Sequence, residues 1–285
     1  MPTNEIAPLQ FVHRLEEIAS ETIKSSYPRY WNEDFISRSF LLALEKALPS
    51  VALAGPELRR RIHWSAWKQV GSAENKFGDI AVLVRIVDAD GLVLEGVGFL
   101  EAKRRYPGSE KYDQLASGQL TRIEEHAPHA MLLLYDYEEA SAYTKYQLYT
   151  GHRARLRDLI PPVTNDGESL GIAVVEETHP FSGVFSTHML VTPIGLIRSI
   201  NLVQAGLYRY ATPLSLQLAM RFLNGFDLEF SREALRTAKG WLDSIGSPRY
   251  LLTITVVPTP QPEGRQLHHE GINTERYIRI QGHEG

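Results

Sequence analysis

Three charged side chains that could do chemistry together stand at the ends of two predicted strands. Asp79 begins one strand-like segment, and Glu101 and Lys103 end the segment that starts at Leu92. A Glu-x-Lys tripeptide by itself is uninformative, because one copy is expected by chance in a chain of this length, and a second copy stands at 74–76. The copy at 101–103 differs in its context, since a predicted hairpin places an acid opposite it.

The turn at 89–91 sets the register of that hairpin. Ala-Asp-Gly there is typical of a three-residue hairpin loop with glycine in the left-handed position. The register places Arg85 opposite Glu95, an opposite-charge cross-strand pair. It also places Asp79 opposite Glu101, with the lysine two positions further on the same face.

A fourth candidate, Glu33, lies at the start of a helix predicted from Asn32 to Leu48. Asn32 is a typical N-cap residue, and two acids follow it in the first turn. Glu33 shares an apolar stripe with Ile36 and Phe40, whereas its neighbour Asp34 lies on a different stripe. We therefore expect Glu33 to lie at the head of the buried face.

Carboxylates held side by side repel each other unless a cation lies between them. Hard oxygen ligands with open coordination positions favour Mg²⁺ or Mn²⁺. Such an ion polarises a phosphoryl oxygen and lowers the pKa of a bound water, and a nearby lysine can orient that water or neutralise developing charge. The residues therefore predict a metal-dependent phosphodiesterase.

These residues resemble the PD-(D/E)XK nucleases, a family with the restriction-endonuclease-like fold, over about residues 30–137. The resemblance implies that Asp79 and Glu101 bind the metal, that the backbone carbonyl of Ala102 assists, and that Lys103 acts on the attacking water. It further implies that Glu33 completes the metal shell. The proline that names the motif is Gly78 in this chain.

The same resemblance implies a glutamine on the helix after the hairpin. Ser109 is predicted to cap a helix that runs to about His126, and Gln119 interrupts the apolar stripe of this helix. Gln119 is therefore the catalytic candidate, and Gln114 is a weaker one because it lies off the stripe. Arg104, Arg105 and Lys111 are candidates for contacts with nucleic-acid phosphates.

The predicted fold class is α/β, with a restriction-endonuclease-like core of a helix, a three-stranded antiparallel meander, a helix and a parallel strand. The meander comprises 61–70, 79–87 and 92–103, and the buried apolar run 130–137 is the parallel strand. We predict a nuclease core at 1–137, a C-terminal α/β extension of the same or a second domain at 138–258, and a mobile polar tail at 259–285. In the extension, strands are expected near 171–176 and 249–257, and helices near 214–223 and 231–245.

Composition limits the other functions. The chain has 285 residues, a formal net charge of −4 and no cysteine, which excludes disulfides, zinc fingers and thiol nucleophiles. No apolar run is long enough to span a membrane, so we expect a cytoplasmic protein without a membrane partner. The expected partner is DNA, double-stranded in preference to single-stranded. The acidic balance is compatible with a homodimer or an activating partner protein, because tight duplex binding takes several phosphate contacts.

The sequence thus predicts a Mg²⁺-dependent DNA endonuclease in restriction, repair or phage defence. The alternative is a catalytically inactive module of the same fold that binds nucleic acid or a partner protein. A third interpretation assigns the candidates ordinary structural roles, with Glu101 and Lys103 as an exposed pair. A Gly-x-Ser-x-Gly match at 167–171 lacks the strand before it and the helix after it that a serine hydrolase requires.

Overall fold

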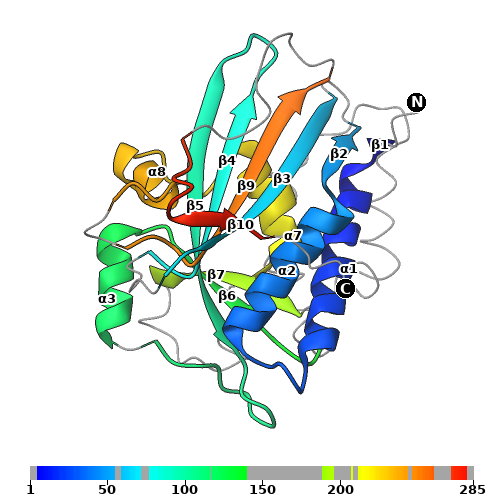
Figure 1. Cartoon of the computed structure of the whole chain (residues 1–285). Coiled ribbons are helices and arrows are strands. Elements are labelled where there is room, and N and C mark those ends of the chain that lie inside the picture. The colour runs from blue at the N-terminus through cyan, green and yellow to red at the C-terminus, as the bar shows by residue number, and fades with distance from the viewer. Residues whose placement is uncertain are drawn as a thin grey trace.

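The computed structural model describes residues 5–54, 59–71, 77–115, 117–139, 188–195, 207, 211–242, 246–259 and 271–280. These residues form a mixed α/β fold around one ten-stranded sheet (Figure 1). The order along the sheet is β1-β2-β3-β9-β4-β5-β6-β7-β8, and β10 also pairs with β3. The strands are β1 (Glu5–Ile6), β2 (Ser50–Leu53), β3 (Arg60–Gln69), β4 (Ile80–Val87), β5 (Val93–Arg104), β6 (Met131–Tyr135), β7 (Met189–Pro193), β8 (Thr212–Pro213), β9 (Tyr250–Pro258) and β10 (Tyr277–Arg279). The helices are α1 (Pro8–Ser26), α2 (Glu33–Ala47), α3 (Ser117–His126), α7 (Leu214–Leu216) and α8 (Arg232–Ala238), and α7 continues as a π-helix, Gln217–Arg221, and a 3₁₀ turn, Phe222–Asn224.

The hairpin of β4 and β5 has the predicted register. Arg85 pairs with Glu95 and Val87 with Val93 in an antiparallel ladder. Gly91 has the left-handed φ of 82° that the loop requires. The following strand, β6, pairs parallel with β5, as predicted for the buried run after the hairpin.

The predicted three-stranded meander is wrong, because β9 lies between β3 and β4. β9 pairs antiparallel with β3 and parallel with β4, so the first two predicted strands do not pair with each other. All nine residues of β9 are buried, which is typical of a central strand covered on both faces. A strand from the predicted extension therefore completes the sheet that carries the candidate site.

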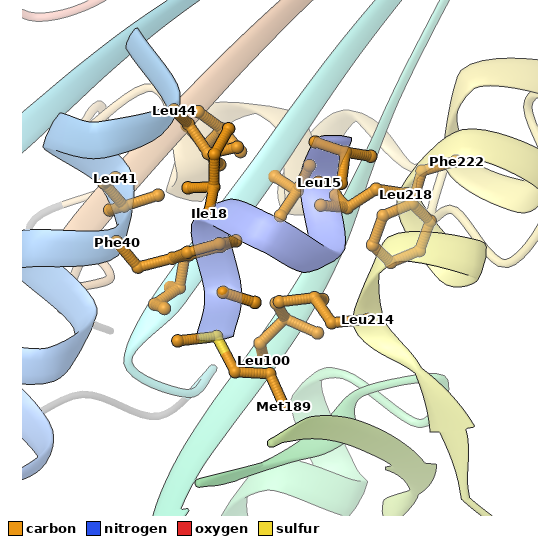
Figure 2. Close-up of a cluster of buried hydrophobic side chains, with 14 of the residues drawn as sticks. Leu15, Ile18, Phe40, Leu41, Leu44, Leu100, Met189, Leu214, Leu218 and Phe222 are labelled. Carbon is orange, nitrogen blue, oxygen red and sulfur yellow. The ribbon is translucent and has the colours of Figure 1, made fainter. Parts of the chain in front are cut away.

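Helices cover both faces of this sheet. On one face, α1 and α2 pack side by side together with the helical segment 214–224, and Figure 2 shows Leu15 and Ile18 of α1 among side chains from α2 and from this segment. The other face carries a second apolar cluster, to which α3 and α8 contribute Ile123, Ala234 and Ala238. Two separately filled cores hold the central strands on both sides.

The helix after the hairpin is shorter than predicted. It begins at Ser117 rather than at Ser109, and Tyr112 instead forms an isolated β-bridge with Arg105. The amide of Lys111 donates to the Ser109 hydroxyl at 3.1 Å, so this serine stabilises a turn instead of capping a helix. The helix near 214–223 is confirmed, whereas α8 ends at Ala238, before a glycine with φ of 81° at position 240.

The prediction of a mobile tail is wrong for the part of it that the structure describes. β10 pairs antiparallel with β3, and the Tyr277 side chain is 1% exposed. Its hydroxyl donates to the Pro248 carbonyl at 2.9 Å. The predicted strand at 171–176 and the serine motif at 167–171 lie outside the described residues.

Candidate functional site

Asp79 lies one residue before β4 and is tied to β5 by its side chain. Its Oδ2 accepts the amide N–H of Ala102 at 3.0 Å, and its carbonyl accepts the amide of Tyr250 at 2.9 Å. The preceding Gly78 has a φ of 104°, and a Cβ there would lie 2.8 Å from the Leu100 carbonyl oxygen. A glycine backbone therefore brings Asp79 against the end of β5, as the predicted register required.

Glu101 and Lys103 form a buried pair at the end of β5. The Nζ atom of Lys103 donates to Glu101 Oε1 at 2.6 Å, and these residues are 6% and 3% exposed. Gln119 of α3 also donates to Glu101 Oε1 at 2.6 Å. The interpretation of Glu101 and Lys103 as an exposed pair is thus wrong, and the predicted glutamine does reach the site. Gln114, the weaker candidate, is exposed.

Glu33 reaches the same group from the N-terminus of α2. Asn32 caps this helix by accepting the Phe35 amide at 2.8 Å, as predicted. Glu33 Oε1 accepts the Arg104 amide at 3.3 Å, and its Oε2 lies 4.0 Å from Lys103 Nζ. One turn further along α2, a hydrogen bond at 2.8 Å between the hydroxyls of Ser37 and Tyr135 of β6 ties the start of this helix to the sheet.

If all three carboxyl groups were ionised, they would carry more negative charge than the Lys103 ammonium group neutralises. Burial raises the pKa of Glu33 to about 8, although the Lys103 ammonium opposes this shift. Burial and then the charge of Asp79 raise the pKa of Glu101 to about 7. Burial also raises the pKa of Asp79. One ammonium group among three acids thus leaves a site that favours an additional cation or bound protons.

Lys103 lies among all three acids. Burial lowers the pKa of Lys103, but Glu101, Glu33 and Asp79 raise it more, so its ammonium group stays charged. The carboxylates are arranged around this ammonium group, and within the described ranges no three His, Asp or Glu side chains already form a metal-chelating group. The donor chemistry, three carboxylates in excess over one cation, still fits a hard divalent ion.

The predicted phosphate-contacting residues have different outcomes. Arg105 is 6% exposed, and its guanidinium binds Asp136 and Glu138, each at 2.9 Å. Its predicted place beside a phosphate is therefore wrong, because its charge is neutralised inside the fold. Arg104 is half-buried and pairs with Asp113 at 3.0 Å, while Lys111 is exposed.

Two residues of this neighbourhood were missed by the sequence analysis. Asp113 raises the pKa of Glu33 as a secondary cause after burial, but the predicted helix from 109 placed it elsewhere. The charge of Arg249, just before β9, lowers the pKa of Asp79 and so opposes the larger effect of burial. Nothing in the local pattern around Arg249 relates it to residue 79, because only the insertion of β9 brings the two together.

Comparisons with protein-family models, with curated proteins and with solved structures found no match for this chain. Among the described residues, no helix is both long and apolar enough to span a bilayer.

Proposed function

We propose that this protein is a divalent-metal-dependent nuclease that hydrolyses phosphodiester bonds of DNA, built on a restriction-endonuclease-like core. Asp79 and Glu101 would hold Mg²⁺ or Mn²⁺, with the Ala102 carbonyl and Glu33 completing the donor set. When bound, the ion supplies charge stabilisation of the phosphoryl group and a lowered pKa for a coordinated water. Cleavage within duplexes, in restriction, repair or phage defence, is the activity that the resemblance to this nuclease family favours.

The observation that carries the proposal is the convergence on Lys103. Four residues from α2, the β4 entry, β5 and α3 meet around its ammonium group or its partner Glu101, although they are far apart in the sequence. A fold gains no stability from burying three mutually repelling acids, so such groups with raised pKa values are typical of functional sites. The opposite charge of Lys103 compensates for only one of them.

Each residue has a distinct part in this proposal. Asp79 is held by the Ala102 amide, which orients its carboxylate. Gln119 fixes the Glu101 carboxylate from the side of α3. Lys103 keeps a positive charge next to the acids, where it can orient a water or neutralise a phosphoryl oxygen. A metal at Glu101 would require the Lys103 ammonium group, now 2.6 Å from Oε1, to be displaced.

The second candidate is an inactive module of the same fold that binds nucleic acid or a protein. One observation favours it: the ammonium group of Lys103 pairs with the Glu101 carboxylate at 2.6 Å. In the part of the chain described here, no three side chains already form a chelating group. In such a module the ammonium group would permanently replace the metal. Mg²⁺ binding separates the two candidates.

The experiment measures Mn²⁺ and Mg²⁺ binding by calorimetry and plasmid cleavage by gel electrophoresis. Wild type is compared with Asp79→Asn, Lys103→Ala and a control, Lys46→Ala, which removes an exposed lysine of α2. We expect Asp79→Asn to lose metal binding and cleavage. Lys103→Ala should keep metal binding but lose at least about 100-fold in cleavage rate, while Lys46→Ala resembles wild type.

Equal cleavage by wild type and Lys103→Ala, in Mg²⁺ and in chelator alike, would show that any nicking comes from a contaminant. Metal binding that Asp79→Asn leaves unchanged would place the ion elsewhere. Either result would refute the proposed site, and an absence of metal binding in wild type would favour the inactive module.

A further inference from the structure

Arg249, one residue before the neighbouring strand β9, lies next to the proposed metal ligand Asp79. The parallel register pairs Ile80 with Tyr250, which places the two preceding residues, Asp79 and Arg249, side by side. The amide of Tyr250 donates to the Asp79 carbonyl at 2.9 Å, and the Arg249 carbonyl accepts the Gln69 amide at 2.9 Å. The backbone of Arg249 is therefore tied to both flanking strands at the edge of the site.

Asp34 holds the Arg249 side chain in place. Its Oδ1 accepts from the guanidinium of Arg249 at 3.2 Å and from the Tyr250 hydroxyl at 2.8 Å. The ammonium group of Lys68, on β3, lies 3.9 Å from Asp34 Oδ2. One carboxylate of α2 thus positions two cations that come from β3 and from the start of β9.

These two cations remain accessible to a ligand. The side chain of Arg249 is 53% exposed and that of Lys68 is 38% exposed. The guanidinium has five N–H donors, and the contact with Asp34 leaves donors for another acceptor. Arg249 and Lys68 thus place two exposed positive charges around Asp34, and Arg249 also lowers the pKa of Asp79, against the larger effect of burial, at the border of the acid-rich site.

We propose that Arg249 and Lys68, held by Asp34, bind the phosphodiester backbone of the nucleic-acid substrate next to the reacting phosphate. This inference rests on the proposed function, because the substrate class is taken from it. A planar guanidinium matches two phosphate oxygens, and an ammonium group contacts a phosphate as a point charge. Neither residue belongs to the motif that suggested a nuclease. Only the position of β9 brings Arg249 beside Asp79 and joins it with Lys68 at Asp34.

The test measures binding without cleavage. A fluorescein-labelled duplex of about 20 base pairs is titrated in chelator, and dissociation constants are obtained by fluorescence anisotropy over a series of salt concentrations. Arg249→Gln and Lys68→Gln are compared with Arg14→Gln. This control removes the same charge from a side chain on α1 that is 51% exposed and pairs with Glu17 at 2.7 Å.

We expect Arg249→Gln and Lys68→Gln each to weaken duplex binding about threefold to tenfold, and to lower the salt slope of log Kd by about one, because each removes one phosphate contact. Arg14→Gln should match wild type in both quantities. Unfolding midpoints of all three variants establish that they are folded, and if Arg249→Gln does not fold, Lys68→Gln carries the test.

Wild-type affinity and salt slope in Arg249→Gln and Lys68→Gln, or a wild-type protein that does not bind the duplex, would overturn the inference. Failure of the proposed function looks different. If Arg249 and Lys68 govern duplex binding but no metal-dependent cleavage occurs, their phosphate-binding role is supported and the proposed nuclease activity is refuted.

Discussion

Gly78 stands where the proposed nuclease family has a proline, and its backbone conformation shows why proline does not fit here. Proline requires a φ near −65°, whereas Gly78 has a φ of 104°. The close approach to the Leu100 carbonyl adds a second reason, because any Cβ would lie 2.8 Å from that oxygen. The glycine lets the backbone approach Leu100 closely, and this approach places Asp79 against the end of β5.

The first prediction follows from this geometry. Gly78→Ala should lower the free energy of unfolding by ~1–3 kcal/mol from the strained φ and by a further ~1–3 kcal/mol from the clash with the Leu100 backbone. Urea denaturation measures both. The matched control is Gly71→Ala, where φ is 98° but no atom lies within 4 Å of a new Cβ. Equal losses in the two variants would show that the close approach has no energetic consequence.

The second prediction concerns the pH dependence of stability without metal. Burial and Asp79 raise the pKa of Glu101 from 4.5 to about 7, so between these values the folded state holds a proton that the unfolded state has released. Raising the pH through this window must therefore lower the free energy of unfolding. Glu101→Gln should flatten that decline in urea denaturation at pH 5, 6 and 7.5.

The exposed Glu110 provides the comparison, and Glu110→Gln should keep the wild-type decline. Added Mg²⁺ should recover stability at pH 7.5 in wild type but not in Glu101→Gln, because only the ionised carboxylate attracts the ion. A pH profile that is identical in both variants would contradict the assignment of the proton to Glu101.

At the scale of elements, the C-terminal strands complete the sheet. β9 separates β3 from β4 and carries Arg249 to the side of Asp79, while β10 extends the edge next to β3. Figure 1 shows β9 between the strands of the N-terminal half. Arg249 and Tyr250 therefore contribute to the proposed site although they lie far from it in the sequence.

The third prediction tests whether β10 is part of the folded core. Tyr277 is 1% exposed and donates to Pro248, so Tyr277→Ala should lower the free energy of unfolding by ~3–5 kcal/mol. The next residue, Ile278, is 55% exposed, and Ile278→Ala should change it by no more than ~0.5 kcal/mol. Chemical denaturation of both variants checks this, and similarly small losses in both would mean that β10 adds little.

At the scale of the whole molecule, a buried acid links α1 to the distant α7. Glu16 is 2% exposed, and its Oε1 accepts the Ser215 hydroxyl at 2.5 Å. Its Oε2 is buried and finds no hydrogen-bond partner among the described residues. Burial raises the pKa of Glu16 to about 8, although the hydrogen bond from Ser215 opposes the shift.

The fourth prediction separates this acid from the proposed site. Between pH 4.5 and about 8 the folded protein holds the Glu16 proton more tightly than the unfolded chain, so stability falls as the pH rises. Glu16→Gln should be more stable than wild type at pH 8.5 and similar to it at pH 5.5, by urea denaturation. Cleavage should be unchanged, and a loss of Mg²⁺ binding in Glu16→Gln would show that the two sites are coupled.

The sequence by itself determined the local geometry of the site. A glycine in a three-residue loop fixed the register of the β4–β5 hairpin, and a capping asparagine fixed the start of α2. Turn and cap preferences act over a few residues, so they can be interpreted without knowledge of the fold. Those two features predicted that Asp79, Glu101 and Lys103 share one face of the hairpin and that Glu33 heads the buried face of α2. Gln119 was singled out because it is a polar residue within an apolar stripe.

Only the tertiary structure decided which distant segments meet. No local pattern shows that β9 enters between β3 and β4, because strand pairing depends on burial over both faces of the whole sheet. The same reason accounts for Arg105, which reads as a surface cation in sequence but is neutralised by Asp136 and Glu138 across the fold. Long-range packing therefore set the position of Arg249 beside Asp79 and of Lys68 beside Asp34, and with it the distribution of charge around the proposed site.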